Sequence, residues 1–263
     1  MMKSWLSLAA AAALVLAAGT ASAETLRVGT EGAYPPYNAT DASGKLVGFE
    51  IDLANELCKR TQMTCEIIQQ DWDGMIPALL NKRYDAIMAG MSVTEERLKQ
   101  IAFSKPYSTT PAWFVSAKDG VLKDAKTLAD VQAALKGKSV GVQRSTIHQN
   151  FLEAKVPGAE VKLYDTQDDL NLDLQNGRID AGLADSLGWK DFLASDAGKA
   201  YNHFGPDLTG KDDPIFGLGV GIGLRKEDTA LKAKLDKALD EVNADGTMTK
   251  LSVQWFGIDT SIK

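Results

Sequence analysis

The sequence predicts an α/β protein made of two like lobes, each built around a mostly parallel sheet. The apolar run at 86–91 is bounded by polar residues and ends in small ones, as a strand buried on both faces does. Residues 174–181 repeat the order of leucine, asparagine, arginine, aspartate and alanine found at 79–86, and the strand at 140–143 mirrors that at 28–31. Chance similarity between two αβ units is the alternative, but several matching features in one order favour two lobes.

The beginning of the chain is typical of an export signal. Lys3 precedes an apolar, alanine-rich stretch at 5–18, and Ala21 and Ala23 are the small residues expected before a cleavage point. We therefore predict that residues 1–23 are a secretory signal peptide. A membrane anchor is the alternative, but the apolar stretch is shorter than the roughly 20 residues that a span needs.

Composition and charge exclude several classes of protein. The 263 residues are 44% hydrophobic and 24% charged, which is ordinary for a globular protein and argues against disorder. Without residues 1–23, which hold one of the 29 basic residues and none of the 35 acidic ones, the formal charge is −7. A negative chain is a poor partner for nucleic acid or an anionic membrane surface.

Cys58 and Cys65 are the only two cysteines. In an oxidising compartment their even count and close spacing suggest one local disulfide, and a reduced pair is the alternative. A zinc site would need further ligands at short spacing, and the only histidines, His148 and His203, lie far away in sequence. We expect neither a metal nor a cofactor.

The first half of the chain alternates strands with short helices. Residues 26–30 alternate as a strand does and lead into a loop with glycine and two prolines, and a helix follows with apolar residues at four-residue spacing. The elements expected here are strand 26–30, helix 48–60, strand 65–70, helix 75–81 and strand 86–91.

The second half repeats this plan and adds a long helix. Two segments, 107–117 and 215–223, are candidate connectors between the lobes, and in the second glycine alternates with apolar residues, which fits a bending crossing strand. After Arg225 an amphipathic helix is predicted to end at a Gly246 cap, before a shorter segment that ends at Phe256. The other expected elements are strand 140–143, a helix from Ile147 and strand 182–185.

Polar and aromatic side chains follow the predicted strands, where ligands of parallel sheets gather. Arg97 has a planar guanidinium that can donate two hydrogen bonds to one carboxylate. Backbone amides at the start of a helix near Ile147 can assist in binding that carboxylate. Asp185 suits an ammonium group, and Glu31 is left for the distal end of the ligand, with aromatic faces for its stem. The candidate ligand-binding residues are Glu31, Tyr34, Trp72, Ala89, Gly90, Ser92, Arg97, Gln143, Thr146, Ile147, His148 and Asp185.

Each of these residues also has a simpler interpretation. Arg97 could be a surface arginine paired with Glu95 or Glu96, and Glu31 could pair with Arg144 of the other lobe. A lone histidine such as His148 is as often a core residue as a ligand contact.

A series of motifs resembles the periplasmic amino-acid-binding proteins of ABC importers, solute-binding protein family 3, over essentially the whole chain after the signal. Within that family the chain resembles the lysine/arginine/ornithine-, histidine- and octopine/nopaline-binding proteins. The motifs are Thr30-Glu31-Gly32-Ala33-Tyr34-Pro35-Pro36-Tyr37, Gly48-Phe49-Glu50-Ile51-Asp52-Leu53, Ile76-Pro77-Ala78-Leu79, Asp85-Ala86-Ile87, Ser92-Val93-Thr94-Glu95-Glu96-Arg97, Gly177-Arg178-Ile179-Asp180-Ala181 and Gly223-Leu224-Arg225-Lys226-Glu227-Asp228.

The resemblance implies a type II periplasmic-binding-protein fold, in which two αβ lobes joined by two crossing strands close on a ligand. The expected first lobe comprises 24–109 and 218–263, and the second 110–217. A monomer in the periplasm of a Gram-negative bacterium is expected, which captures a cationic amino acid such as arginine, lysine, ornithine or histidine and delivers it to a membrane permease.

The same resemblance implies a role for individual residues. Arg97 would bind the ligand carboxylate and Asp185 its amino group, with Tyr34 and Trp72 on either side of the ligand side chain. Glu31 stands where binders of cationic amino acids have an acid. The cysteine spacing matches a disulfide found in relatives.

The sequence also departs from the basic-amino-acid binders. Ala89 and Gly90 replace serines, and Ile147 replaces a hydroxyl residue for which Thr146 could compensate. Trp72-Asp73-Gly74 and Ala89-Gly90-Met91, at the end of the strand predicted at 86–91, resemble the opine binders, so an opine is the alternative ligand. An enzyme on the same scaffold is a further alternative, with Glu31 as its only candidate acid or base.

Overall fold

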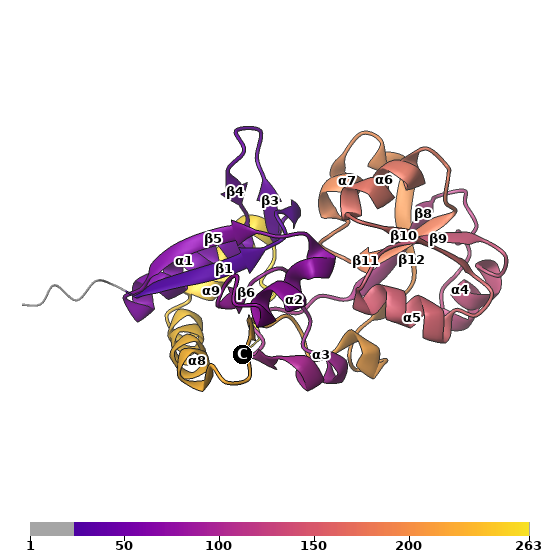
Figure 1. Cartoon of the computed structure of the whole chain (residues 1–263). Coiled ribbons are helices and arrows are strands. Elements are labelled where there is room, and N and C mark those ends of the chain that lie inside the picture. Colours follow the sequence, from indigo (N-terminus) through magenta and orange to yellow (C-terminus); the bar gives the residue numbers. More distant parts are fainter. Residues whose placement is uncertain (1–23, 263) are drawn as a thin grey trace, which may run out of the picture.

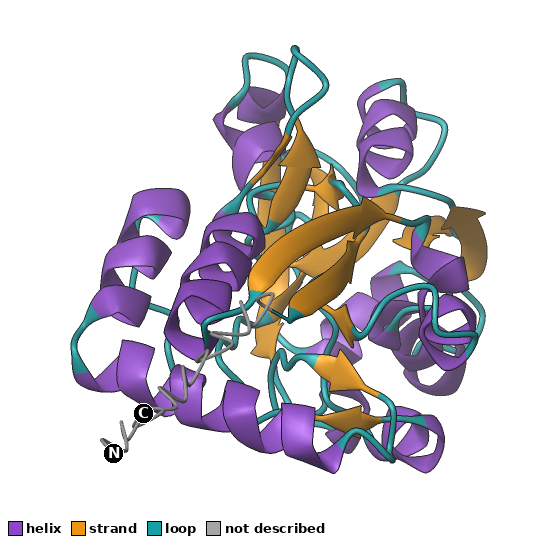
Figure 2. Ribbon diagram, turned by 60° about the vertical axis from the view of Figure 1, so that its left-hand side comes forward, coloured by secondary structure: helices purple, strands orange, loops and turns teal. Residues whose placement is uncertain are grey.

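Two five-stranded sheets, each covered by helices, form the two lobes of the structure, a computed structural model that describes residues 24–262. Figure 1 shows the lobes next to each other, with the chain passing between them before β8 and again before β13. Figure 2 shows the same arrangement with the helices outside the strands. The predicted signal peptide, residues 1–23, lies outside the described residues.

The first lobe contains the sheet with strand order β5-β1-β6-β13-β7 and a small hairpin sheet, β2-β3-β4. Its strands are β1 (Thr25–Thr30), β2 (Ala33–Tyr34), β3 (Asn38–Thr40), β4 (Leu46–Val47), β5 (Thr64–Gln69), β6 (Ala86–Ile87), β7 (Ala102–Phe103) and β13 (Gly223–Leu224). Its helices are α1 (Phe49–Thr61), the 3-10 turn η1 (Trp72–Gly74), α2 (Met75–Leu80), α3 (Glu95–Gln100), α8 (Thr229–Ala244) and α9 (Thr247–Phe256).

The second lobe contains the sheet with strand order β10-β9-β11-β8-β12. Its strands are β8 (Ala112–Ala117), β9 (Ser139–Gln143), β10 (Glu160–Tyr164), β11 (Ala181–Asp185) and β12 (Tyr201–Leu208). Its helices and 3-10 turns are α4 (Leu128–Ala134), α5 (Ile147–Lys155), α6 (Gln167–Gln175), α7 (Lys190–Ala194), η2 (Gly198–Ala200) and η3 (Pro214–Phe216).

The helices begin and end where the sequence supplies the required chemistry. The α1 helix buries Phe49, Leu53 and Leu57 against the sheet, and it begins after Gly48, whose φ of 132° and closeness to the Tyr37 carbonyl exclude a side chain. Threonine side chains cap α4, α5 and α6 by accepting a backbone N–H. The cap residue of α8 is Asp245, one position before the predicted Gly246, which has a φ of 80° and precedes α9.

The two sheets have the same plan. In each, three neighbouring strands are parallel and the fourth strand is reversed. The reversed strands, β8 and β13, are those that follow the two crossings between lobes. The prediction of mostly parallel sheets is confirmed. The fourth strand makes each sheet mixed, because a strand that enters from the other lobe needs no helical crossover.

Two predicted strands are shorter than expected. The run at 86–91 forms a ladder only as β6, and the chain bends at Gly90, whose φ is 62°. The glycine-rich segment at 215–223 contributes a 3-10 turn, single bridges from Val220 to Ser92 and Ser108, and the start of β13. The Val220–Ser108 bridge joins the two crossing segments, and the boundaries at 109/110 and 217/218 stay a prediction.

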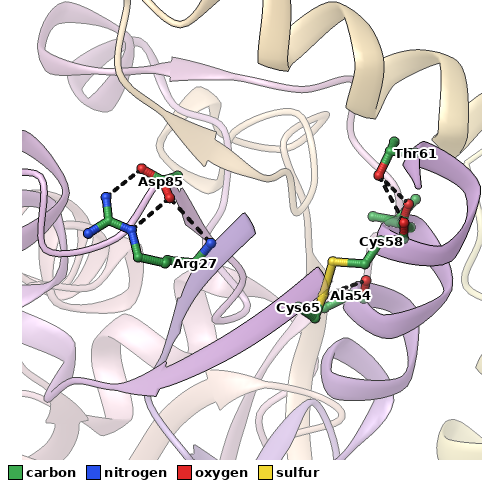
Figure 3. Close-up of a disulfide and its surroundings, with 7 residues drawn as sticks. Arg27, Ala54, Cys58, Thr61, Cys65 and Asp85 are labelled. Carbon is green, nitrogen blue, oxygen red and sulfur yellow. Dashed lines mark hydrogen bonds and ion pairs between the residues drawn. A yellow bond between two sulfur atoms is a disulfide. The ribbon is translucent and has the colours of Figure 1, made fainter. Parts of the chain in front are cut away.

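The predicted disulfide between Cys58 and Cys65 is confirmed, and it links α1 to β5 (Figure 3). Neither cysteine lines the cavity between the lobes described below. Reduction is therefore expected to cost about 2 kcal/mol of unfolding free energy, as for a short closed loop, and to leave ligand affinity unchanged. Denaturant midpoints with and without reductant test the first expectation and calorimetry the second. Two alkylatable thiols in native protein would contradict the pairing.

Among residues 24–262, none of the helices is long and apolar enough to cross a bilayer.

Candidate functional site

A cavity lined by residues of both lobes lies where strands β1, β6, β9 and β11 end. All twelve predicted site residues line it, together with three others. The complete lining is Glu31, Tyr34, Trp72, Ala89, Gly90, Ser92, Arg97, Gln143, Thr146, Ile147, His148, Gln167, Leu183, Ala184 and Asp185. Their individual roles stay predictions.

Glu31 follows β1 directly and is 5% exposed. Its Oε1 accepts a hydrogen bond of 2.6 Å from Nε2 of Gln143, the last residue of β9 in the second lobe. Burial raises the pKa of Glu31 to about 7, against the opposing effect of the Gln143 hydrogen bond. The alternative pairing with Arg144 is wrong in this structure, because Arg144 forms an ion pair of 2.7 Å with Asp165.

Ala89, Gly90 and Ser92 form the loop that follows β6. Gly90 has a φ of 62°, which a side chain would strain, and its N–H donates to the carboxylate of Glu50. Ala89 and Ser92 are both buried. Because Ala89 and Gly90 carry no polar side-chain atom, this loop offers a ligand mainly backbone groups.

Arg97 lies on α3 with its guanidinium beside the same loop. It donates to the carbonyls of Ser92, at 3.0 Å, and Ser145, at 3.4 Å, and it stacks 5.2 Å from the centre of the Trp72 ring. Burial lowers the pKa of Arg97 to about 10, so the group stays charged at neutral pH. The alternative interpretation, a surface arginine paired with Glu95 or Glu96, is wrong, since within the described part of the chain neither of them forms an ion pair with Arg97.

The second lobe presents the start of α5 to the cavity. Thr146 is its N-cap and uses its hydroxyl twice, to accept from Gln149 N–H and to donate to the Gln143 carbonyl. Ile147 and His148 are the first helical residues, so their N–H groups have no partner within the helix. The Thr146 hydroxyl is therefore occupied, and amides are what α5 offers to an anion.

Asp185 ends β11 on the other side of the cavity. Its Oδ2 accepts from the Tyr34 hydroxyl of the first lobe at 2.9 Å, and its Oδ1 is 3.6 Å from Nε2 of His148. His148 is 5% exposed, and its Nε2 has no hydrogen-bond partner in the part of the chain that the structure describes. Tyr34 thus connects the two lobes at the point where Asp185 faces the cavity.

Sequence reasoning missed Gln167, Leu183 and Ala184. Gln167 begins α6 after the Thr166 cap and is 2% exposed, and its Oε1 has no hydrogen-bond partner among the described residues. It follows β10, so the rule applied to four other strand ends would have found it. Leu183 and Ala184 belong to β11 itself and are buried apolar residues, which pattern alone does not separate from core.

The cavity contains charges of both signs in separate places. Arg97 and the start of α5 can bind a carboxylate, whereas Asp185 and Glu31 can each bind a cationic group. Gln167 Oε1 adds a neutral acceptor. The arrangement therefore suits a small molecule with one anionic and two cationic groups.

Comparisons with known proteins agree with this geometry. The family model for bacterial extracellular solute-binding proteins, family 3, matches residues 26–258. The L-arginine-binding protein of Pseudomonas aeruginosa is 39% identical over 262 residues, 98% of each chain. The histidine-binding periplasmic protein of Salmonella typhimurium is 41% identical over 260 residues, 97% of this chain and 96% of its own. The solved structure of a Salmonella typhimurium periplasmic binding protein with high arginine specificity has a TM-score of 0.80 and 35% identity, and the match covers 89% of this chain and 100% of that one.

Proposed function

We propose, since the chain belongs to the bacterial extracellular solute-binding proteins, family 3, that it captures a cationic amino acid, with arginine preferred, between its two lobes. The observation that carries the proposal is the charge pattern of the cavity. One guanidinium, which has no carboxylate partner among residues 24–262, faces two carboxylates from different lobes. A free α-amino acid with a cationic side chain complements all three groups.

The ligand carboxylate binds Arg97, with the first amides of α5 as further donors. Charge-assisted hydrogen bonds of this kind are stronger than neutral ones. Asp185 accepts from the α-ammonium group, in place of or beside its bond from Tyr34. A backbone carbonyl of the Ala89–Gly90 loop is the second acceptor for that group.

The ligand side chain extends toward Glu31, with Tyr34 beside its methylene stem. One face of Trp72 already lies against Arg97, so only its other face and edge are left for the stem. Glu31 and Gln167 Oε1 are two acceptors at the distal end. A guanidinium, which has five N–H donors, can satisfy both, and for this reason we place arginine before lysine.

The proposal has two further parts, which concern where the protein acts and what it meets there. The protein acts in the periplasm as a monomer, and the ligand-bound form delivers the amino acid to the membrane permease of an ABC transporter. An opine is disfavoured because its substituted nitrogen and second carboxylate would approach Asp185, which repels an anion.

A thermal-shift panel tests the ligand class. Arginine, lysine, ornithine, histidine, citrulline, glutamate and octopine are added separately to the exported protein. Arginine is expected to give the largest rise in melting temperature, because a ligand at ~100 times its dissociation constant adds about 2.7 kcal/mol to stability. Glutamate and citrulline are expected to give little or none. A larger shift with octopine than with arginine would contradict the proposal.

A further inference from the structure

The carboxylate of Glu50 is buried beneath the cavity, in the first turn of α1. The residue is 0% exposed, and within the described part of the chain no lysine, arginine or histidine forms an ion pair with it. Burial raises the pKa of Glu50, and three hydrogen bonds oppose that effect. An acid in such a place is costly unless its hydrogen bonds accomplish something that an apolar residue could not.

Those hydrogen bonds reach three separate segments. Glu50 Oε1 accepts from the Gly90 N–H at 2.7 Å and from the Tyr107 hydroxyl. Its Oε2 accepts from Asn38 Nδ2 at 2.8 Å, and Asn38 Oδ1 in turn accepts from the Gly32 N–H at 2.7 Å. The network is therefore a continuous chain from Gly32 to Gly90 with a branch to Tyr107.

Each segment belongs to the binding apparatus. Gly32 follows Glu31, and Gly90 belongs to the loop that lines the cavity between Ala89 and Ser92. Tyr107 directly precedes Ser108, whose bridge to Val220 joins the two crossing segments. The Glu50 side chain itself does not line the cavity.

We propose that Glu50 is a positioning residue, which sets the backbone of both ligand loops of the first lobe and ties them to the crossing segment. The inference rests on the proposed function for the identity of the ligand, but Glu50 does not touch that ligand. The N–H and C=O of a trans peptide point in opposite directions, so the Gly90 N–H bond turns the Ala89 carbonyl away from Glu50. The same bond polarises that carbonyl and makes it a better acceptor for an ammonium group.

The direction of the network explains why a carboxylate is needed. Both ends of the chain are backbone N–H groups, which can only donate, so Asn38 must present its oxygen to Gly32 and its NH₂ to Glu50. The residue at 50 must then accept on both sides. A glutamine at position 50 places its NH₂ group against a second donor, either the NH₂ of Asn38 or the N–H of Gly90. If the Asn38 amide turns over to avoid this, its own NH₂ group then faces the N–H of Gly32.

The test compares Glu50→Gln with Asp85→Asn in the exported protein, at a temperature where both are folded. Asp85 is a matched control because it also links segments of the first lobe, through Arg27 (Figure 3) and Arg225, but it does not line the cavity. In Glu50→Gln we expect arginine to bind about tenfold more weakly or worse, as for one buried donor left unsatisfied. In Asp85→Asn we expect unchanged affinity.

Glycine amide exchange measured by NMR without ligand gives a second readout. In the parent and in Asp85→Asn, the Gly32 and Gly90 amides are expected to be protected, and in Glu50→Gln at least one of them loses its protection. Unchanged protection of both amides with unchanged affinity would overturn the inference. Because amide exchange is measured without ligand, it tests the positioning role of Glu50 even if the parent protein does not bind arginine. Failure of the parent to bind arginine would count against the proposed function alone.

A milder variant covers the case in which Glu50→Gln does not fold. Asn38→Ala removes the link from Glu50 to the Gly32 N–H, next to Glu31. It leaves the hydrogen bond from the Gly90 N–H to the Glu50 carboxylate in place. We expect it to reduce the preference for arginine over citrulline severalfold and to expose the Gly32 amide but not the Gly90 amide. A uniform loss for both ligands, with Gly32 still protected, would contradict the positioning role.

Discussion

Replacing Arg97 by alanine is expected to weaken arginine binding by about 2–5 kcal/mol, because the ligand carboxylate would then be buried without its charged partner. Arg97 also donates to the carbonyl of Ser145 in the second lobe, so the variant loses a bond between the lobes as well. Arg97→Lys keeps the positive charge but loses the planar guanidinium that binds a carboxylate with two hydrogen bonds. We expect its affinity for arginine to lie between those of the parent and Arg97→Ala. Isothermal calorimetry measures all three proteins.

Arg178→Ala is the matched control, because Arg178 is an exposed arginine paired with Asp173 in the second lobe, outside the cavity. Its affinity for arginine should equal that of the parent. Small-angle scattering should show ligand-induced compaction in the parent and in Arg178→Ala and none in Arg97→Ala at the same ligand concentration. Parent-like affinity in Arg97→Ala would mean that the carboxylate binds elsewhere, for instance only at the start of α5.

The residues that line the cavity could be predicted from the sequence because the end of a strand is visible in the local pattern of apolar and polar residues. Glu31, Gln143 and Asp185 each end or follow an apolar strand, and parallel neighbours bring such ends to one edge. Strand β10 was not among the predicted strands, so the residues that follow it were not considered and Gln167 was missed. Strand direction was another limit, since the apolar pattern of β8 does not record that it enters from the other lobe.

Contacts between distant segments could not be read from local pattern. The Tyr34 hydroxyl bonds to Asp185 across 151 positions, and Glu50 meets Tyr107 across 57. An acid in the first turn of a helix is ordinary, because it is favourable near the helix N-terminus even when exposed. Only the fold shows that Glu50 is buried there and that its partners are the binding loops.

Glu31→Gln is expected to remove most of the selectivity for ligand charge. The substitution keeps the shape of the side chain and removes its negative charge, so the cationic end of arginine loses a charge-assisted hydrogen bond of about 1.5–3 kcal/mol. Citrulline, which is neutral at that end, should bind the variant about as weakly as it binds the parent. Calorimetry with both ligands separates this outcome from a role for Glu31 in lobe contact alone, for which both ligands would weaken equally because the Gln143 bond loses its charge assistance.

The pH dependence of arginine binding offers an independent check on the same carboxylate. Burial raises the pKa of Glu31 to about 7 without ligand, and a bound cation beside it favours the ionised form and lowers that pKa. Binding near and below pH 7 must therefore release a proton, so arginine affinity should rise as the pH increases from about 5 to 8. Glu31→Gln should lose this dependence on pH, and citrulline should show little of it with either protein. An arginine affinity in the parent that stays constant over this range would mean that Glu31 does not contact the ligand cation.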